Sequence, residues 1–234
     1  MRHAWRQFGL GVGAILLVLT AGLLIRFAAA DLPVGPDVAW QELMASHRVA
    51  PGVAVAQAMA WIGKSPGTWF VSAGAMAVAL ILRQWRTAIA LLLAVEIGVT
   101  CSSAIKLLSA RPRPTGAVDL VGSFAFPSGH TTWAAAVAAS LALALPHVWS
   151  WAFAGAWIAL MAWSRTYLGV HWLSDVAAGA VLGIGVALLA AGVVATVSGQ
   201  AFLVGMLAEL VVAKLAVTAE PFAISETLGL GGTP

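Results

Sequence analysis

Charged residues are scarce in this sequence, at 9% of 234 residues, whereas ordinary soluble domains carry roughly 25%. Hydrophobic residues make up 61%, which leaves too little polar surface to cover a soluble fold. The scarcity excludes a soluble globular protein and predicts an integral membrane protein. The formal net charge of +3 comes from few charges and no long basic run is present, so we expect no nucleic-acid partner.

The sequence also has a single cysteine, Cys101, which excludes an internal disulfide framework. A free cysteine in an apolar stretch behaves mostly as a small buried residue. Acidic residues are too sparse to form the kind of oxygen cluster that holds Mg²⁺. We therefore expect no metal and no other cofactor.

Six apolar segments approach the roughly 20 residues that a helix needs to cross a bilayer. They cover residues 8–29, 67–83, 87–108, 129–146, 150–168 and 173–197. The fold class that we expect is all-α, an integral membrane helical bundle with about six transmembrane helices. The first segment is longer than the apolar region of a typical signal peptide, and further spans follow, so we expect it to remain uncleaved.

The spans divide the chain into four parts. These are residues 1–30, the first transmembrane helix; 31–66, an extracytoplasmic loop with interfacial helices near 37–46 and 51–62; 67–197, the remaining transmembrane core; and 198–234, a C-terminal interfacial helix and disordered tail. The apolar stretch within the last part contains Glu209 and Lys214. Because a charge near a helix centre costs ~2.5–3.5 kcal/mol on insertion, an interfacial helix is favoured over a seventh span.

Two patterns within the spans concern packing. Glu96 lies near the middle of the third span, where we expect a structural hydrogen bond, with substrate or proton handling as the alternative. Small residues recur in the last span, where they permit close helix packing. They are Ala177, Ala178, Gly179, Gly183 and Gly185.

The positions of arginine predict the orientation, because cytoplasmic ends of spans carry an excess of basic residues. Arg2 and Arg6 precede the first span, and Arg83 and Arg86 connect the second to the third. An even number of crossings separates the two places, so both are expected on the cytoplasmic side of the cell (inner) membrane. The opposite ends of the spans then face the extracytoplasmic side.

Polar residues gather at these outward ends. Lys106, Arg113 and Arg165 can bind an anion with several oxygens, because Arg offers a planar fork of donors and Lys a point charge. Ser128 and Gly129 stand where a helix begins, whose first N–H groups and dipole favour phosphate. Glycine also lets the backbone approach a phosphate oxygen closely. We predict phosphate-binding roles for all five residues.

Three further residues can perform chemistry on that phosphate. His171 and Asp175 are four residues apart, a rise of ~6 Å along a helix. If the helix has begun at His171, the carboxylate can hold one imidazole nitrogen and leave the other as nucleophile. His130 can protonate the leaving oxygen, since imidazole titrates near neutral pH. Arg111 lies outside this spacing, and it is expected either to support the phosphate site from behind the binding residues or to anchor a headgroup.

The pattern Lys106-x6-Arg113-Pro114, Pro127-Ser128-Gly129-His130 and Ser164-Arg165-x5-His171-x3-Asp175 resembles the three-part signature of the type 2 phosphatidic acid phosphatase (PAP2) superfamily. No position departs from it. The resemblance implies a helical bundle with its catalytic site in residues 67–197, opening outward as in bacterial membrane members. It implies His171 as nucleophile, Asp175 as its partner and His130 as acid, with phosphate held by Lys106, Arg113, Ser128, Gly129 and Arg165.

The implied function is hydrolysis of lipid phosphate monoesters or diphosphates through a phosphohistidine. Phosphatidic acid, phosphatidylglycerol phosphate and undecaprenyl diphosphate are the candidate substrates. The partners are the lipid and the bilayer, and the sequence does not indicate an oligomeric state. A lipid phosphotransferase would use the same residues, whereas a non-catalytic transporter or scaffold would be expected to have lost some of them.

Overall fold

The computed structural model describes residues 1–28, 33, 35–118, 124–145, 147–197 and 205. All regular secondary structure in these ranges is helical, which confirms the all-α prediction. The helices are α1 (Arg2–Ala28), α2 (Gly35–Ser46), α3 (Ala50–Ile62), α4 (Gly67–Ile81), α5 (Trp85–Ser109), α6 (Gly129–Ala144), α7 (Val148–Tyr167) and α8 (Leu173–Thr196). Residues Met1–Thr196 form one compact unit. The predicted interfacial helix and tail at 199–234 lie almost wholly outside the described residues.

The six predicted spans correspond to α1 and α4 to α8. Three of the described helices, α1, α5 and α8, are long and apolar enough to cross a membrane by themselves. Helices α4 and α6 have 15 and 16 residues, fewer than the roughly 20 that a full crossing needs, so the count of six is approximate. The short helices expected near 37–46 and 51–62 are α2 and α3, and their position at a membrane surface stays a prediction.

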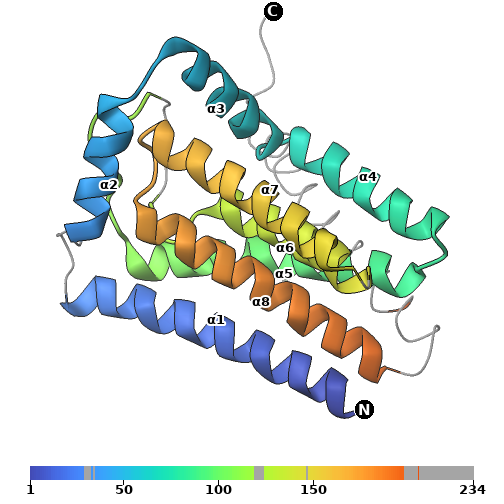
Figure 1. The fold of residues 1–234 in the computed structure, drawn as a ribbon. Helices are drawn as coiled ribbons and strands as arrows, with labels where there is room; N and C mark the ends of the chain where they lie inside the picture. The colour runs from blue at the N-terminus through green and yellow to red at the C-terminus, as the bar shows by residue number, and fades with distance from the viewer. Residues whose placement is uncertain (29–32, 34, 119–123, 146, 198–204, 206–234) are drawn as a thin grey trace, which may run out of the picture. The chain divides into compact units, whose positions relative to one another are not determined.

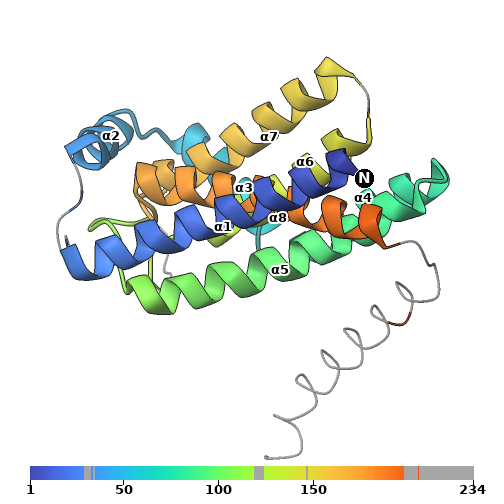
Figure 2. The ribbon, with the colours of Figure 1, turned by 90° about the horizontal axis from the view of Figure 1, so that it is seen from below.

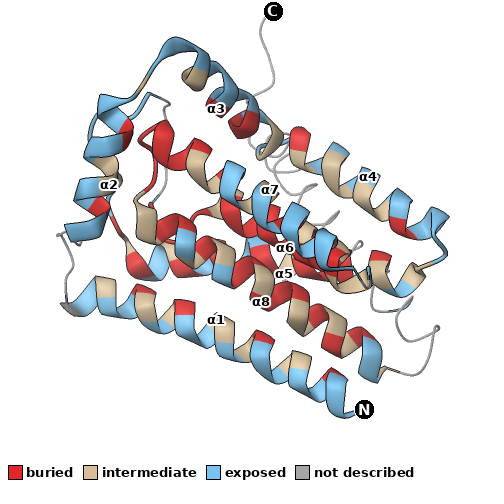
Figure 3. Ribbon diagram, viewed as in Figure 1, coloured by how far each residue is buried: buried red, intermediate tan, exposed pale blue. Residues whose placement is uncertain are grey.

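Helices α6 and α8 form the centre of the bundle. Helix α8 packs along α1, α5 and α6, and α6 also packs against α5 and α7; α1 and α5 lie side by side in Figure 2. Buried residues concentrate on α6 and α8, whereas the outer sides of α1 and α4 are exposed (Figure 3). The exposed residues there include Leu17, Phe27, Trp69 and Phe70. Large apolar side chains on an outer surface are what contact with lipid requires.

Glycines of α8 allow this close packing, as the sequence predicted. A Cβ at Gly183 would collide with the carbonyl oxygen of Thr132 and the side chain of Ala135 on α6. A Cβ at Gly185 would lie 2.5 Å from that of Ala14 on α1. Helix α8 therefore approaches two neighbours through positions where only hydrogen fits.

Helices α2 and α3 pack on the end of α7 (Figure 1). The hydroxyl of Tyr167 accepts a hydrogen bond from the backbone N–H of Val49 at 2.8 Å and donates to the carbonyl of His47 at 3.0 Å. Nε of Arg48 donates to the carbonyl of Tyr167 at 2.9 Å. These bonds fasten the α2–α3 segment beside the turn that follows α7.

The glycine contact predicts a difference between two alanine variants. Gly183→Ala should lower the free energy of unfolding by about 1–3 kcal/mol, the usual cost of overpacking a tight core, because its methyl group must displace the backbone of α6. Gly155→Ala on α7 is the control, since a Cβ there meets no described atom within 4 Å. Thermal unfolding in detergent measures both. A midpoint for Gly183→Ala equal to that of the control would contradict the packing.

Candidate active site

The predicted polar residues come together where α5 and α7 end and α6 and α8 begin. Helix α5 ends at Ser109, and the following residue, Ala110, has a left-handed φ of 47°. Arg111 comes before a proline, a position that disfavours helix. Five residues, 168–172, separate α7 from α8. Gly169 among them has a φ of 70°, which glycine adopts without steric cost. This short connection holds the end of α7 beside the start of α8.

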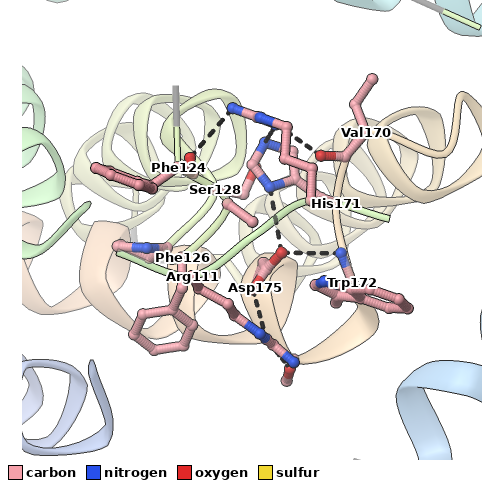
Figure 4. Close-up of polar contacts among 12 residues, drawn as sticks. Arg111, Phe124, Phe126, Ser128, Val170, His171, Trp172 and Asp175 are labelled. Atoms are coloured by element: carbon pink, nitrogen blue, oxygen red, sulfur yellow. Dashed lines mark hydrogen bonds and ion pairs between the residues drawn. The ribbon is translucent and has the colours of Figure 1, made fainter. Parts of the chain in front are cut away.

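The two groups beside the ring nitrogens of His171 favour one of its tautomers. Its Nε2 lies 3.2 Å from Nη1 of Arg113, and its Nδ1 lies 3.4 Å from Oδ2 of Asp175 (Figure 4). A guanidinium can only donate, so the contact with Arg113 favours the tautomer in which Nε2 is unprotonated and Nδ1–H faces the carboxylate. The 3.4 Å separation is longer than an ordinary N–H···O hydrogen bond, so the interaction of the pair is mainly electrostatic in this structure.

The reason why His171 meets Asp175 differs from the one we expected. Helix α8 begins at Leu173, so His171 precedes the helix and the two residues share no helical face. Asp175 instead turns back toward the start of α8, where its Oδ2 accepts a hydrogen bond from the backbone N–H of Trp172 at 2.8 Å. An acidic side chain at the third helical position often satisfies the first N–H group in this way. The helix terminus thus orients the carboxylate toward His171.

Arg111 contacts the other oxygen of Asp175. Its Nη1 donates to Oδ1 of Asp175 at 2.6 Å, and its Nη2 donates to Oδ2 of Asp37 at 2.6 Å. Arg111 is 5% exposed, which excludes a headgroup anchor, and these bonds direct it to two carboxylates. The sequence did not identify Asp37, because it lies 74 positions from Arg111. Its only local signal is an acidic residue at the start of a predicted helix.

Lys106 and Arg113 bind the loop before α6. Nζ of Lys106 donates to the carbonyls of Phe124 at 3.1 Å and Pro127 at 2.6 Å. Arg113 donates to the carbonyls of Phe124 at 3.2 Å and Val170 at 2.6 Å. Lys106 therefore holds the connection before α6, and Arg113 joins that connection to the one before α8.

Arg165, at the end of α7, is the third cation and is 1% exposed. Burial, and then the charges of Lys106, Arg113 and Arg165, lower the pKa of His171 well below its usual value. Both effects disfavour the charged imidazolium. His171 is therefore neutral at pH 7, as a nucleophile must be.

Ser128 is the N-cap of α6, as predicted, but among the described residues its side chain caps no backbone N–H group. Its hydroxyl accepts a hydrogen bond from Oγ1 of Thr131 at 3.1 Å. The backbone N–H of Ser128 donates to the carbonyl of Asp175 at 3.0 Å and so ties α6 to α8. A Cβ at Gly129 would lie 3.9 Å from Cε of Lys106, which places the glycine beside the cations.

His130 follows on the first turn of α6. Its Nε2 lies 3.2 Å from the carbonyl oxygen of Ala60, near the end of α3. A carbonyl can only accept, so Nε2 carries a proton and Nδ1 is the other functional nitrogen. His130 is close enough to His171, Lys106 and Arg165 to interact with them electrostatically. The structure thus brings all eight predicted site residues to one end of the bundle.

Comparisons with known proteins show which family this part of the chain resembles. The PAP2 superfamily matches residues 87–198. An undecaprenyl-diphosphatase of Sulfolobus acidocaldarius is 27% identical over 177 residues, which cover 72% of this chain and 84% of that protein. A lipid A 4'-phosphatase of Bacteroides thetaiotaomicron is 29% identical over 117 residues, which cover 43% of this chain and 52% of that protein.

Two solved structures share the fold. The transmembrane PAP2 type phosphatidylglycerolphosphate phosphatase of Bacillus subtilis aligns with a TM-score of 0.68 at 25% identity, over 81% of this chain and 98% of that one. Aquifex aeolicus LpxE aligns with a TM-score of 0.59 at 22% identity, over 66% of this chain and 93% of that one, and supports the fold alone. All eight predicted site residues lie within the matched range 87–198. Residues 87–198 therefore form a PAP2 superfamily domain, and the chain is similar to membrane lipid phosphatases that share this domain.

Proposed function

We propose that this protein hydrolyses lipid phosphate monoesters or diphosphates through a phosphohistidine on His171, without a metal ion. The observation that carries the proposal is the position of the His171 ring between Asp175 and Arg113. Asp175 lies beside Nδ1 and Arg113 lies beside Nε2. In this arrangement the lone pair of Nε2 points toward the guanidinium of Arg113. A phosphoryl group drawn there by Arg113 meets the nucleophile directly.

The first step forms the bond from Nε2 of His171 to phosphorus and breaks the bond to the leaving oxygen. The negative charge of the bound phosphate favours the charged form of His130, which gives a proton to that oxygen. Since Nε2–H of His130 faces the carbonyl of Ala60, the transferred proton comes from Nδ1. Asp175 stabilises the positive charge that develops on the ring of His171. In the second step the neutral His130 takes a proton from water, which attacks the phosphohistidine and releases phosphate.

The cations stabilise the charge of the transferred group. Lys106, Arg113 and Arg165 surround the nucleophile closely enough to lower its pKa. The hydroxyl of Ser128 and the first N–H groups of α6, next to Gly129, add donors. Together they can supply the electrostatic stabilisation that phosphoryl transfer requires, with no metal ion.

The direction of the leaving group supports a lipid substrate. In-line transfer puts the leaving oxygen opposite His171, next to His130. Val137 lies seven residues further along α6, on the same helical face. It borders an apolar cavity of about 430 Å³ between α4, α6 and α7, which Val71 and Trp157 also line. This cavity offers an apolar place for a lipid tail on the helix that carries His130, with the buried side chain of Trp133 between the two.

The opposite end of the bundle supports the proposed orientation. Gln7, Arg86, Ser140 and Ala195 line one small cavity, so the starts of α1 and α5 meet the ends of α6 and α8 there. The basic residues at the starts of α1 and α5, which are Arg2, Arg6 and Arg86, therefore lie at the end remote from His171. By the positive-inside rule, we propose that the active site faces the extracytoplasmic side of the cell (inner) membrane.

The relatives suggest which lipids to test. They are named for undecaprenyl diphosphate, lipid A and phosphatidylglycerolphosphate, which share a phosphate or diphosphate on a lipid. We propose phosphatidic acid, phosphatidylglycerol phosphate and undecaprenyl diphosphate as the first substrates to assay.

Removal of the nucleophile should abolish turnover. His171→Ala should lower phosphate release from the best of these lipids by at least roughly 10³-fold, the scale of losing a nucleophile, with an unchanged unfolding midpoint. The wild type should also yield an acid-labile phosphoenzyme that the variant lacks. Substantial activity in folded His171→Ala would refute the histidine mechanism. Transfer of phosphate to a lipid alcohol instead of water would identify a phosphotransferase.

The acid role of His130 depends on the leaving group. His130→Gln should slow hydrolysis of a lipid alkyl phosphate by roughly 10²–10⁴-fold, the usual contribution of a general acid. It should slow p-nitrophenyl phosphate much less, because that leaving group needs little protonation. Single-turnover rates with both substrates test this. An equal loss for both would assign His130 to another role.

Chelation tests the metal-free mechanism. Phosphate release by protein purified and assayed in EDTA should equal that of untreated protein. The phosphate cradle, formed by Lys106, Arg113, Arg165, Ser128 and Gly129, supplies the positive charge through its three cations. Activity that disappears in EDTA and returns with Mg²⁺ would contradict this part of the proposal.

A further inference from the structure

Asp37 on α2 is a buried carboxylate outside the range of the family match. It is 1% exposed and makes three short contacts. Its Oδ2 lies 2.6 Å from Nη2 of Arg111 and 2.7 Å from the hydroxyl of Ser174, and its Oδ1 accepts the backbone N–H of Ser174 at 2.8 Å. Both partners of Asp37 are therefore next to Asp175, because Arg111 binds its carboxylate and Ser174 precedes it in the chain.

Arg111 extends these contacts to the nucleophile. Its planar guanidinium binds Asp37 through one terminal nitrogen and Asp175 through the other, both at 2.6 Å. Trp172 lies against the guanidinium, with 5.7 Å from Cζ to the ring centroid. Asp175 in turn faces Nδ1 of His171 (Figure 4). Asp37, Arg111, Asp175 and His171 thus form one continuous series of contacts.

We propose that Asp37 is a positioning residue for His171, acting through Arg111 and Asp175; this inference rests on the proposed function. One part of the action is electrostatic. Asp37, Arg111 and Asp175 carry two negative charges and one positive charge, so one negative charge remains opposite the ring of His171. Without Asp37, Arg111 would neutralise Asp175 at the moment when the ring becomes positive.

The other part is geometric. Asp37 accepts the N–H of Ser174, one of the N–H groups at the start of α8 that lack an intrahelical partner. It thereby caps, from another helix, the turn that carries Asp175. Partners one layer behind a catalytic group orient it in this way at metal sites, where their loss typically costs 10–100-fold. We expect an effect of roughly that size here.

Two variants of α2 separate this role from a general effect of charge. Asp37→Asn and Glu42→Gln each remove one negative charge from the same helix, and Glu42 is exposed. Asp37→Asn should lower kcat by roughly 10–100-fold and leave KM within about twofold, because the phosphate cradle is intact. Glu42→Gln should behave as wild type. A wild-type kcat for Asp37→Asn would overturn the proposal.

A double variant tests whether Asp37 acts through Asp175. Asp37→Asn in an Asp175→Asn background should cause little further loss of kcat, because the two residues belong to one series. If Asp37→Asn lowers kcat by the same factor in the Asp175→Asn background as in wild type, Asp37 has an independent structural role and the inference is overturned. Should Asp37→Asn not fold, Arg111→Lys replaces it. The single ammonium of lysine cannot bind both carboxylates as the two terminal nitrogens of Arg111 do, so kcat should fall while KM is retained. A wild-type kcat for Arg111→Lys would refute the proposed action of Asp37 through Arg111.

Oxyanion binding separates this inference from the proposed function. Orthovanadate can accept the imidazole as a fifth ligand, whereas inorganic phosphate needs only the cradle. Asp37→Asn should weaken orthovanadate at least roughly tenfold and leave phosphate within about twofold, measured by calorimetry in detergent. If the wild type hydrolyses no lipid phosphate, the proposed function fails while this comparison still tests Asp37. Equal orthovanadate affinity in both proteins, or no orthovanadate binding by wild type, overturns the positioning role.

Discussion

The carboxylate of Asp175 is the group on which this end of the bundle depends. One oxygen is bound to Arg111, and the other faces His171 and accepts the first N–H of α8. The carbonyl of the same residue accepts the N–H of Ser128 at the start of α6. A single residue therefore joins two helix starts and the nucleophile, so the packing of α6 against α8 also sets the geometry of the site.

Several charges are buried together here, at the end of an otherwise apolar bundle. Burying an ion is expensive unless it is paired and hydrogen-bonded. Asp37, Arg111 and Asp175 satisfy this condition by binding one another, and Lys106 does so through loop carbonyls. The same contacts that offset desolvation also fix the positions of the side chains. The protein thus obtains a rigid active site from interactions that the buried charges need in any case.

The two histidines are oriented by different parts of the chain. Asp175 and Arg113, both within the family match at 87–198, orient the ring of His171. The carbonyl of Ala60 on α3 orients the ring of His130. The α2–α3 segment, outside that domain, contacts one histidine through Ala60 and approaches the other through Asp37. A segment that the sequence suggests only as surface helices therefore belongs to the catalytic end of the molecule, and it is fastened there by Tyr167.

The sequence by itself determined the helices and the eight candidate residues. Apolar runs mark α1 and α4 to α8, prolines interrupt them, and the motifs keep a fixed spacing, all of which are local properties. Only the tertiary structure decided that Arg111 pairs with Asp37, 74 positions away, and that Asp37 reaches Ser174 across 137 positions. It also decided where α8 begins and which groups face the nitrogens of each histidine. These features depend on contacts between distant segments, which no local pattern of residues encodes.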